Sequence, residues 1–157
     1  MRRFLVGLVL IMAIPTVYAN TANYSKLAVG DWLCHFEYRP SSTDDFQFEK
    51  SYSYAKLSSD GHLTIDVVGQ VRKDNVDGVY RAKVEGNWRV DGNRYHWETT
   101  KVLRLDYSDR LELVGFGELM NELIAVSEKI IRLDDKHFDT VDDTDESDPL
   151  YNDCTRL

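Results

Sequence analysis

The chain has 157 residues, of which 27 are acidic and 19 are lysine or arginine, and its formal net charge at neutral pH is -8. This length is enough for one domain with a hydrophobic core. An acidic surface repels phosphate backbones and anionic lipid headgroups, so the charge argues against nucleic acid and membrane surfaces as partners.

The N-terminal segment, residues 1–19, has the pattern of a secretory signal peptide. Arg2 and Arg3 precede an apolar run over residues 4–14, and Val17-Tyr18-Ala19 supplies small side chains for cleavage before Asn20. The run is too short to cross a hydrocarbon core of about 30 Å comfortably as a permanent anchor. We therefore expect cleavage, a periplasmic or secreted location, and no membrane insertion afterwards.

Two cysteines, Cys34 and Cys154, lie near the two ends of the expected exported domain, residues 20–157. In an oxidising compartment an even pair most simply forms one disulfide. The alternatives are a redox pair or metal ligands, but the spacing is not that of Cys-x-x-Cys, and no cluster of histidines flanks either cysteine. We expect a structural disulfide that ties the first strand to the last.

Alternation of apolar and polar residues, which is typical of half-buried strands, dominates the exported domain. In the first run Trp32, Cys34, Phe36 and Tyr38 share one face, and a loop is expected over residues 40–46. Further strands are predicted over residues 47–58, 62–71, 80–90, 94–100, 125–133, 136–141 and 150–156. Tight turns are predicted at Asp60-Gly61, Asp77-Gly78 and Asp91-Gly92.

Residues 109–124 break this alternation, because their apolar side chains recur near helical spacing. Ser108 or Asp109 could cap the start of a helix, and the glycines that follow weaken its first part. The pattern predicts one short helix over Glu118–Ile124.

About eight short strands joined mostly by tight turns predict an all-β fold, a single antiparallel up-and-down barrel with one short helix between strands. Closing the sheet removes its exposed edges. A barrel of this size has an interior that side chains can fill or that holds one small ligand.

Several short motifs are similar to those of the lipocalin superfamily. Gly30-Asp31-Trp32 resembles its Gly-x-Trp signature, and small bacterial lipocalin-like domains are similar in three later features. These are the hairpin Gly86-Asn87-Trp88-Arg89-Val90-Asp91-Gly92, the helical insertion after it, and a last strand carrying Cys154-Thr155-Arg156. The resemblance implies that Trp32 packs across the closed end of the barrel beneath an arginine, for which Arg156 is the first candidate and Arg132 the second.

Two histidine–carboxylate pairs, His35 with Glu37 and His96 with Glu98, raise the question of a zinc site. Both pairs lie opposite the aromatic face of their strands, so we expect them on the surface. The acidic segment 142–148 could bind calcium, but it lacks the glycine and the ligand spacing of an EF-hand, and we expect a solvated loop. No metal site or cofactor is predicted.

Aromatic residues are abundant on the faces predicted to point inward. Tyrosines and tryptophans suit an apolar ligand cavity with a few polar groups, and the alternative is that they simply fill a small barrel. The candidate ligand-binding residues are Tyr38, Tyr80, Trp88, Tyr95 and Trp97.

The sequence contains no nucleophile elbow, phosphate-binding loop or dinucleotide-binding motif, so we expect no enzyme activity. The first expectation is an exported lipocalin-like binding module for a small apolar molecule. The alternative is a periplasmic inhibitor or immunity protein that neutralises a basic enzyme such as a lysozyme, since the acidic surface would suit a basic protein partner.

Overall fold

A computed structural model of the chain describes residues 21–37, 46–122, 124–143 and 150–157. The expected signal peptide, Tyr38, most of the loop over residues 40–46 and most of the acidic segment 142–148 lie outside these residues. The elements in chain order are α1 (Thr21–Ala28), β1 (Gly30–Glu37), β2 (Gln47–Leu57), β3 (His62–Lys73), β4 (Val76–Asp91), β5 (Arg94–Tyr107), α2 (Asp109–Glu112), α3 (Phe116–Met120), β6 (Ala125–Leu133), β7 (Phe138–Asp142) and β8 (Leu150–Arg156).

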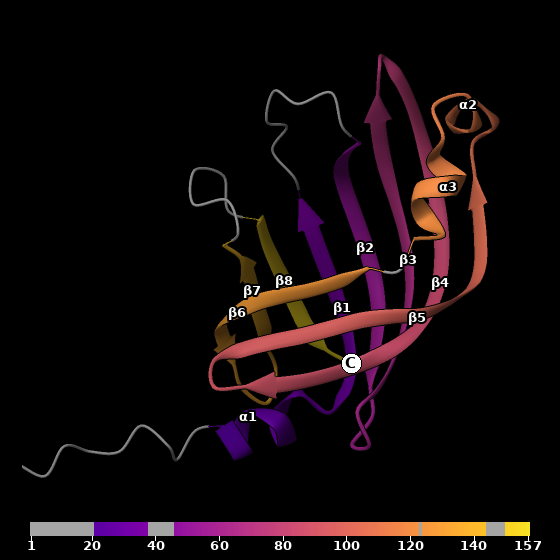
Figure 1. The fold of residues 1–157 in the computed structure, drawn as a ribbon. Coiled ribbons are helices and arrows are strands. Elements are labelled where there is room, and N and C mark those ends of the chain that lie inside the picture. Colours follow the sequence, from indigo (N-terminus) through magenta and orange to yellow (C-terminus); the bar gives the residue numbers. More distant parts are fainter. Residues whose placement is uncertain (1–20, 38–45, 123, 144–149) are drawn as a thin grey trace, which may run out of the picture.

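The strands form one closed antiparallel barrel in which each strand pairs with its neighbours in the sequence (Figure 1). The last strand, β8, returns to pair with β1, so the sheet has no free edge. The predicted all-β, up-and-down barrel is therefore confirmed. Among the described helices, none is long and apolar enough to span a bilayer.

Closure of the barrel places the two cysteines directly opposite each other. Cys34 on β1 is the register partner of Cys154 on β8, and a disulfide joins them across 120 residues of sequence. The predicted disulfide is confirmed, and it links the first strand of the barrel to the last.

The hairpin of β4 and β5 is long and strongly curved (Figure 1). Its register shifts twice, between Lys83 and Val84 and between Glu85 and Gly86, and such bulges bend a sheet and increase its twist. A Cβ at Gly86 would overlap the carbonyl oxygen of Glu98, so the close approach of the two backbones here requires glycine. Only the first part of β5, Arg94–Glu98, continues into pairing with β6.

The predicted turn at Asp77-Gly78 is wrong, because both residues lie within β4. The chain turns instead at Asp74 and Asn75, whose φ angles of 50° and 63° are ones that short polar side chains tolerate. At Gly78 a Cβ would overlap the side chain of Leu111 in α2. Gly78 therefore makes room for a helix rather than for a turn.

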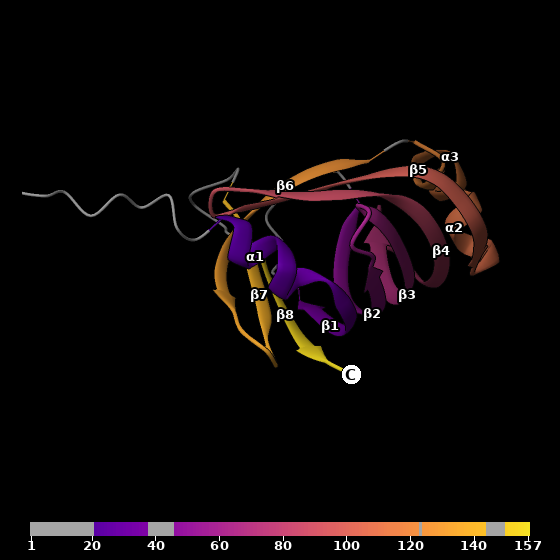
Figure 2. The same cartoon turned by 90° about the horizontal axis from the view of Figure 1, so that it is seen from below.

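The single helix predicted over Glu118–Ile124 is also wrong in number and bounds. Two short helices, α2 and α3, occupy this insertion, and they are separated at Gly115, whose φ is 77°. Ser108 precedes α2 without capping it, because its hydroxyl accepts a hydrogen bond from the Val79 amide at 3.1 Å. A further helix that was not predicted, α1, lies beneath the barrel (Figures 1 and 2).

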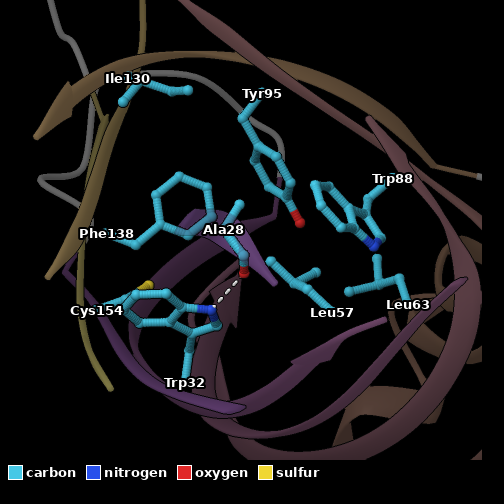
Figure 3. Packing of buried hydrophobic residues seen from close by; sticks show 9 residues of the cluster. All are labelled: Ala28, Trp32, Leu57, Leu63, Trp88, Tyr95, Ile130, Phe138 and Cys154. Carbon is cyan, nitrogen blue, oxygen red and sulfur yellow. Dashed lines mark hydrogen bonds between the residues drawn. The ribbon is translucent and has the colours of Figure 1, made fainter. Parts of the chain in front are cut away.

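The buried residues form two clusters at the two ends of the barrel. The closed-end cluster (Figure 3) comprises Ala28, Trp32, Leu57, Leu63, Trp88, Tyr95, Ile130, Phe138 and Cys154. The helix-end cluster, against α2 and α3, comprises Val71, Tyr80, Ala82, Leu111, Phe116 and Met120. A ligand site inside the barrel would therefore lie between these two clusters.

We predict that replacing both cysteines by alanine lowers the free energy of unfolding by about 2–5 kcal/mol, because the disulfide constrains a long loop of the unfolded chain. Urea unfolding of the oxidised and the variant protein measures the difference. An equal stability of the two proteins would contradict the role assigned to this bond.

Candidate ligand-binding cavity

Trp32 seals one end of the barrel. Its side chain is fully buried, and its indole Nε1 donates a hydrogen bond of 2.8 Å to the Ala28 carbonyl at the end of α1 (Figure 3). The ring also packs edge-on against Phe138, with 5.5 Å between the ring centroids. This end of the barrel is therefore occupied by protein side chains and covered by a helix.

Arg156 covers the outer side of Trp32, with its guanidinium carbon 4.2 Å from the ring centroid. The guanidinium also donates hydrogen bonds to the carbonyls of Val29, at 2.9 Å, and Leu27. Gly30 lies directly beside it, where a Cβ would overlap Arg156 Nη1. Arg132, the second candidate for this position, pairs instead with Asp134 at 2.8 Å.

A cavity of about 350 Å³ lies inside the barrel between the two clusters. It is bounded by side chains from several strands and from α3, most of them apolar. Its apolar and aromatic lining comprises Phe36, Phe48, Ile65, Val67, Tyr80, Ala82, Val84, Trp97, Met120, Ile124, Val126 and Leu150. Its polar lining comprises Ser51, Ser53, Thr99, Glu128, Asp142 and Asn152.

A smaller cavity of about 90 Å³ lies deeper, against Trp32 and Phe138. Its lining shares Ser53, Ile65, Trp97, Glu128 and Asn152 with the larger cavity. Because the same side chains border both spaces, the two form an upper and a lower compartment of one barrel interior.

Glu128 lies at the junction of these compartments, although only 5% of its surface is exposed. Its carboxyl accepts hydrogen bonds from the Asn152 amide at 3.1 Å, from the Trp97 indole at 3.5 Å and from the Thr140 hydroxyl. Burial raises the pKa of Glu128 above its ordinary value, an effect that the three hydrogen bonds oppose and the charge of Asp142 adds to.

Tyr80 lines the upper compartment from β4. Burial raises the pKa of Tyr80 to about 12, and a hydrogen bond with Ser51 opposes this shift. Its phenol is therefore neutral over the physiological range and acts as a hydrogen-bonding group rather than as a charge.

The structure brings only some of the predicted ligand-binding residues to the cavity. Tyr80 and Trp97 line the upper compartment, and Tyr95 and Trp97 line the lower one. Trp88 lines neither: it packs in the closed-end cluster, and its indole donates to the Ser58 carbonyl at 3.0 Å. Tyr38 lies outside the described residues.

Glu128, Thr140 and Asn152 form the polar centre of the cavity, and none of them was among the predicted site residues. The sequence does contain one indication that Glu128 is buried, because alternation along β6 puts it on the same face as Val126 and Ile130. A carboxylate between two apolar residues of an inward face indicates a buried polar group.

The histidines expected on the surface lie on the outer side of the barrel. His35 stacks on Tyr52, a residue that is 54% exposed, with 4.8 Å between the ring centroids. His96 alternates with the inward-facing Tyr95 and Trp97. In the described part of the chain, no group of three or more histidine, cysteine or acidic side chains is placed to hold a metal ion.

Asp143, at the start of the acidic segment, pairs with Arg94 at 2.8 Å. The remainder of that segment, residues 144–148, lies outside the described residues.

Comparisons of the chain with protein-family models, with curated proteins and with solved structures find no match. The resemblance to lipocalin-like domains therefore stays a prediction.

We predict that Arg156→Lys lowers the free energy of unfolding by about 1–3 kcal/mol, since lysine cannot reproduce a guanidinium that bridges two carbonyls and covers Trp32. Arg132→Lys, at an exposed arginine, is the matched control and should change stability little. Chemical unfolding followed by tryptophan fluorescence measures both variants. Equal effects of the two substitutions would contradict the role assigned to Arg156.

We predict that the stability of the wild type falls relative to Glu128→Gln as the pH rises above the ordinary glutamate pKa of 4.5. Below that pH, Glu128 is protonated in both the folded and the unfolded chain. Above it, the unfolded chain ionises first, so the folded chain with its raised pKa loses relative stability. Urea unfolding of both proteins from about pH 4 to pH 8 measures this, and a difference that is constant or grows with pH would contradict it.

Proposed function

We propose that the protein is an exported, non-enzymatic binding module whose barrel holds one small, largely apolar molecule. The observation that carries the proposal is the cavity of about 350 Å³ between the two clusters. Its size is within the range of small-molecule sites, which run from roughly 300 to 1,000 Å³, and its lining has the usual mixture of apolar side chains and few polar groups.

The distribution of the aromatic residues supports binding over simple filling of the barrel. Trp32, Trp88, Tyr95 and Phe138 already form a packed core at the closed end. The upper compartment is bordered by smaller residues as well, among them Ala82, Val67 and Ser53. An apolar cavity that stays unfilled reduces stability, so an apolar ligand that fills this one would stabilise the fold.

Export is the second part of the proposal. The N-terminal sequence pattern supports it, and the Cys34–Cys154 disulfide is the kind of bond that persists in oxidising compartments. The alternative function, inhibition of a basic enzyme, stays a prediction from the acidic composition.

The experiment uses the fluorescent dye N-phenyl-1-naphthylamine, a small neutral apolar probe, with the protein purified from the oxidising compartment. We predict that the dye binds the wild type and that Val67→Phe, which fills the upper compartment, weakens binding at least tenfold. Val68→Phe is the matched control, because Val68 is the next residue of β3 and is 50% exposed on the outer face.

Retention of full dye affinity by Val67→Phe, or an equal loss in both variants, would contradict binding inside the barrel. Native mass spectrometry of the same preparation tests whether a small molecule is carried through purification by the wild type and lost in Val67→Phe.

A further inference from the structure

The charged groups that line the barrel interior have one sign. Among the described residues that border the two compartments, the charged side chains are Glu128 and Asp142, and no lysine, arginine or histidine borders either. Glu128 lies deep at the junction, and Asp142 lies at the end of β7. An apolar ligand with an anionic head would bring like charges together, whereas a cationic head would be attracted.

Hydrogen bonds hold Glu128 in place, and no counter-ion among the described residues pairs with it. Thr140, Asn152 and Trp97 all direct donors at its two oxygens. In the described part of the chain, no salt bridge joins Glu128 to a basic side chain. A buried carboxylate without an opposite charge is costly, and a cation bound beside it relieves that cost.

The carboxyl also keeps capacity for one more donor. An ionised carboxylate has about four acceptor positions, and the three protein donors occupy Oε1 twice and Oε2 once. The free position is on an oxygen of a side chain that lines the cavity. An ammonium group donates in several directions and accepts nothing, so it can bond to this remaining acceptor position.

Aromatic rings lie next to this carboxyl. Trp97 lines both compartments and donates to Glu128, and Tyr95 on the same strand is the register partner of Glu128.

We propose that the cavity selects small apolar amines, with the protonated amine paired to Glu128 and the apolar body in the upper compartment. This inference rests on the proposed binding function and names the chemical class of the ligand. The volume of the cavity limits the size of the ligand. A molecule with one bicyclic aromatic body and a two-carbon arm fits within about 350 Å³.

The test compares three probes that share one body and differ in the head: 2-(1-naphthyl)ethylamine, 2-(1-naphthyl)ethanol and 1-naphthylacetate. Isothermal titration calorimetry at pH 7 measures their affinities for the wild type. We predict that the amine binds at least tenfold more tightly than the alcohol and that the carboxylate binds most weakly.

In Glu128→Gln the preference for the amine over the alcohol should fall to within about threefold. Glu98→Gln is the matched control, because it removes the same charge from an exposed residue of β5 whose carboxyl bonds to Asn87 on the outer face. That variant should keep the wild-type preference.

A second measurement on the wild type alone covers the case in which Glu128→Gln does not fold. Nuclear Overhauser effects from the methylene next to the amine should reach the Trp97 indole and the Val126 methyl groups, both of which line the cavity near Glu128. Contacts of that methylene with Phe48 and Met120 instead would place the head at the helix end and overturn the proposal.

The outcomes separate the two proposals. If neither the three naphthyl probes nor the neutral dye bind the wild type, the proposed binding function is wrong. The inference about the amine is then wrong as well. If the alcohol and the amine bind equally, or if Glu128→Gln keeps the preference for the amine, the binding function stands and the assignment of an amine to Glu128 is overturned.

Discussion

Pairing of β1 with β8 is the constraint on which the rest of the structure depends. The two strands come from opposite ends of the described chain, and their register places Trp32 opposite Arg156 and Cys34 opposite Cys154. The disulfide and the guanidinium that covers Trp32 both act on this seam. Because a barrel has an interior only when its sheet closes, the cavity exists through contacts between residues more than a hundred positions apart.

The curvature of the β4–β5 hairpin shapes the cavity that this closure creates. Two bulges and Gly86 let the hairpin bend, so that the first part of β5 pairs with β6 while the remainder extends toward α2 and α3. Leu111 of α2 then packs over Gly78, and Met120 of α3 reaches the cavity lining. The helical insertion thereby borders the interior beside β4 and β5, whereas Trp32 and α1 cover the opposite end.

The burial of Glu128 has a cost in stability. A carboxyl in this position costs stability at neutral pH, and Thr140, Asn152 and Trp97 offset only part of that cost. A hydrophobic residue would pack the junction of the two compartments at lower cost. The presence of an acid there, in a cavity without basic groups among its described lining residues, fits the binding role that we propose.

The sequence by itself determined the strands, most of the turns and the disulfide, because alternation, Asp-Gly pairs and an even number of cysteines are local or compositional signals. Only the tertiary structure decided that Gly78 makes space for the Leu111 side chain and does not form a turn. It also decided that Trp88 packs in the core while Trp97 faces the cavity, and that Glu128 is buried. Alternation tells which face of a strand points inward. How deep a residue lies along the barrel axis depends on the register between strands and on what packs above them, and neither is encoded within a few neighbouring residues.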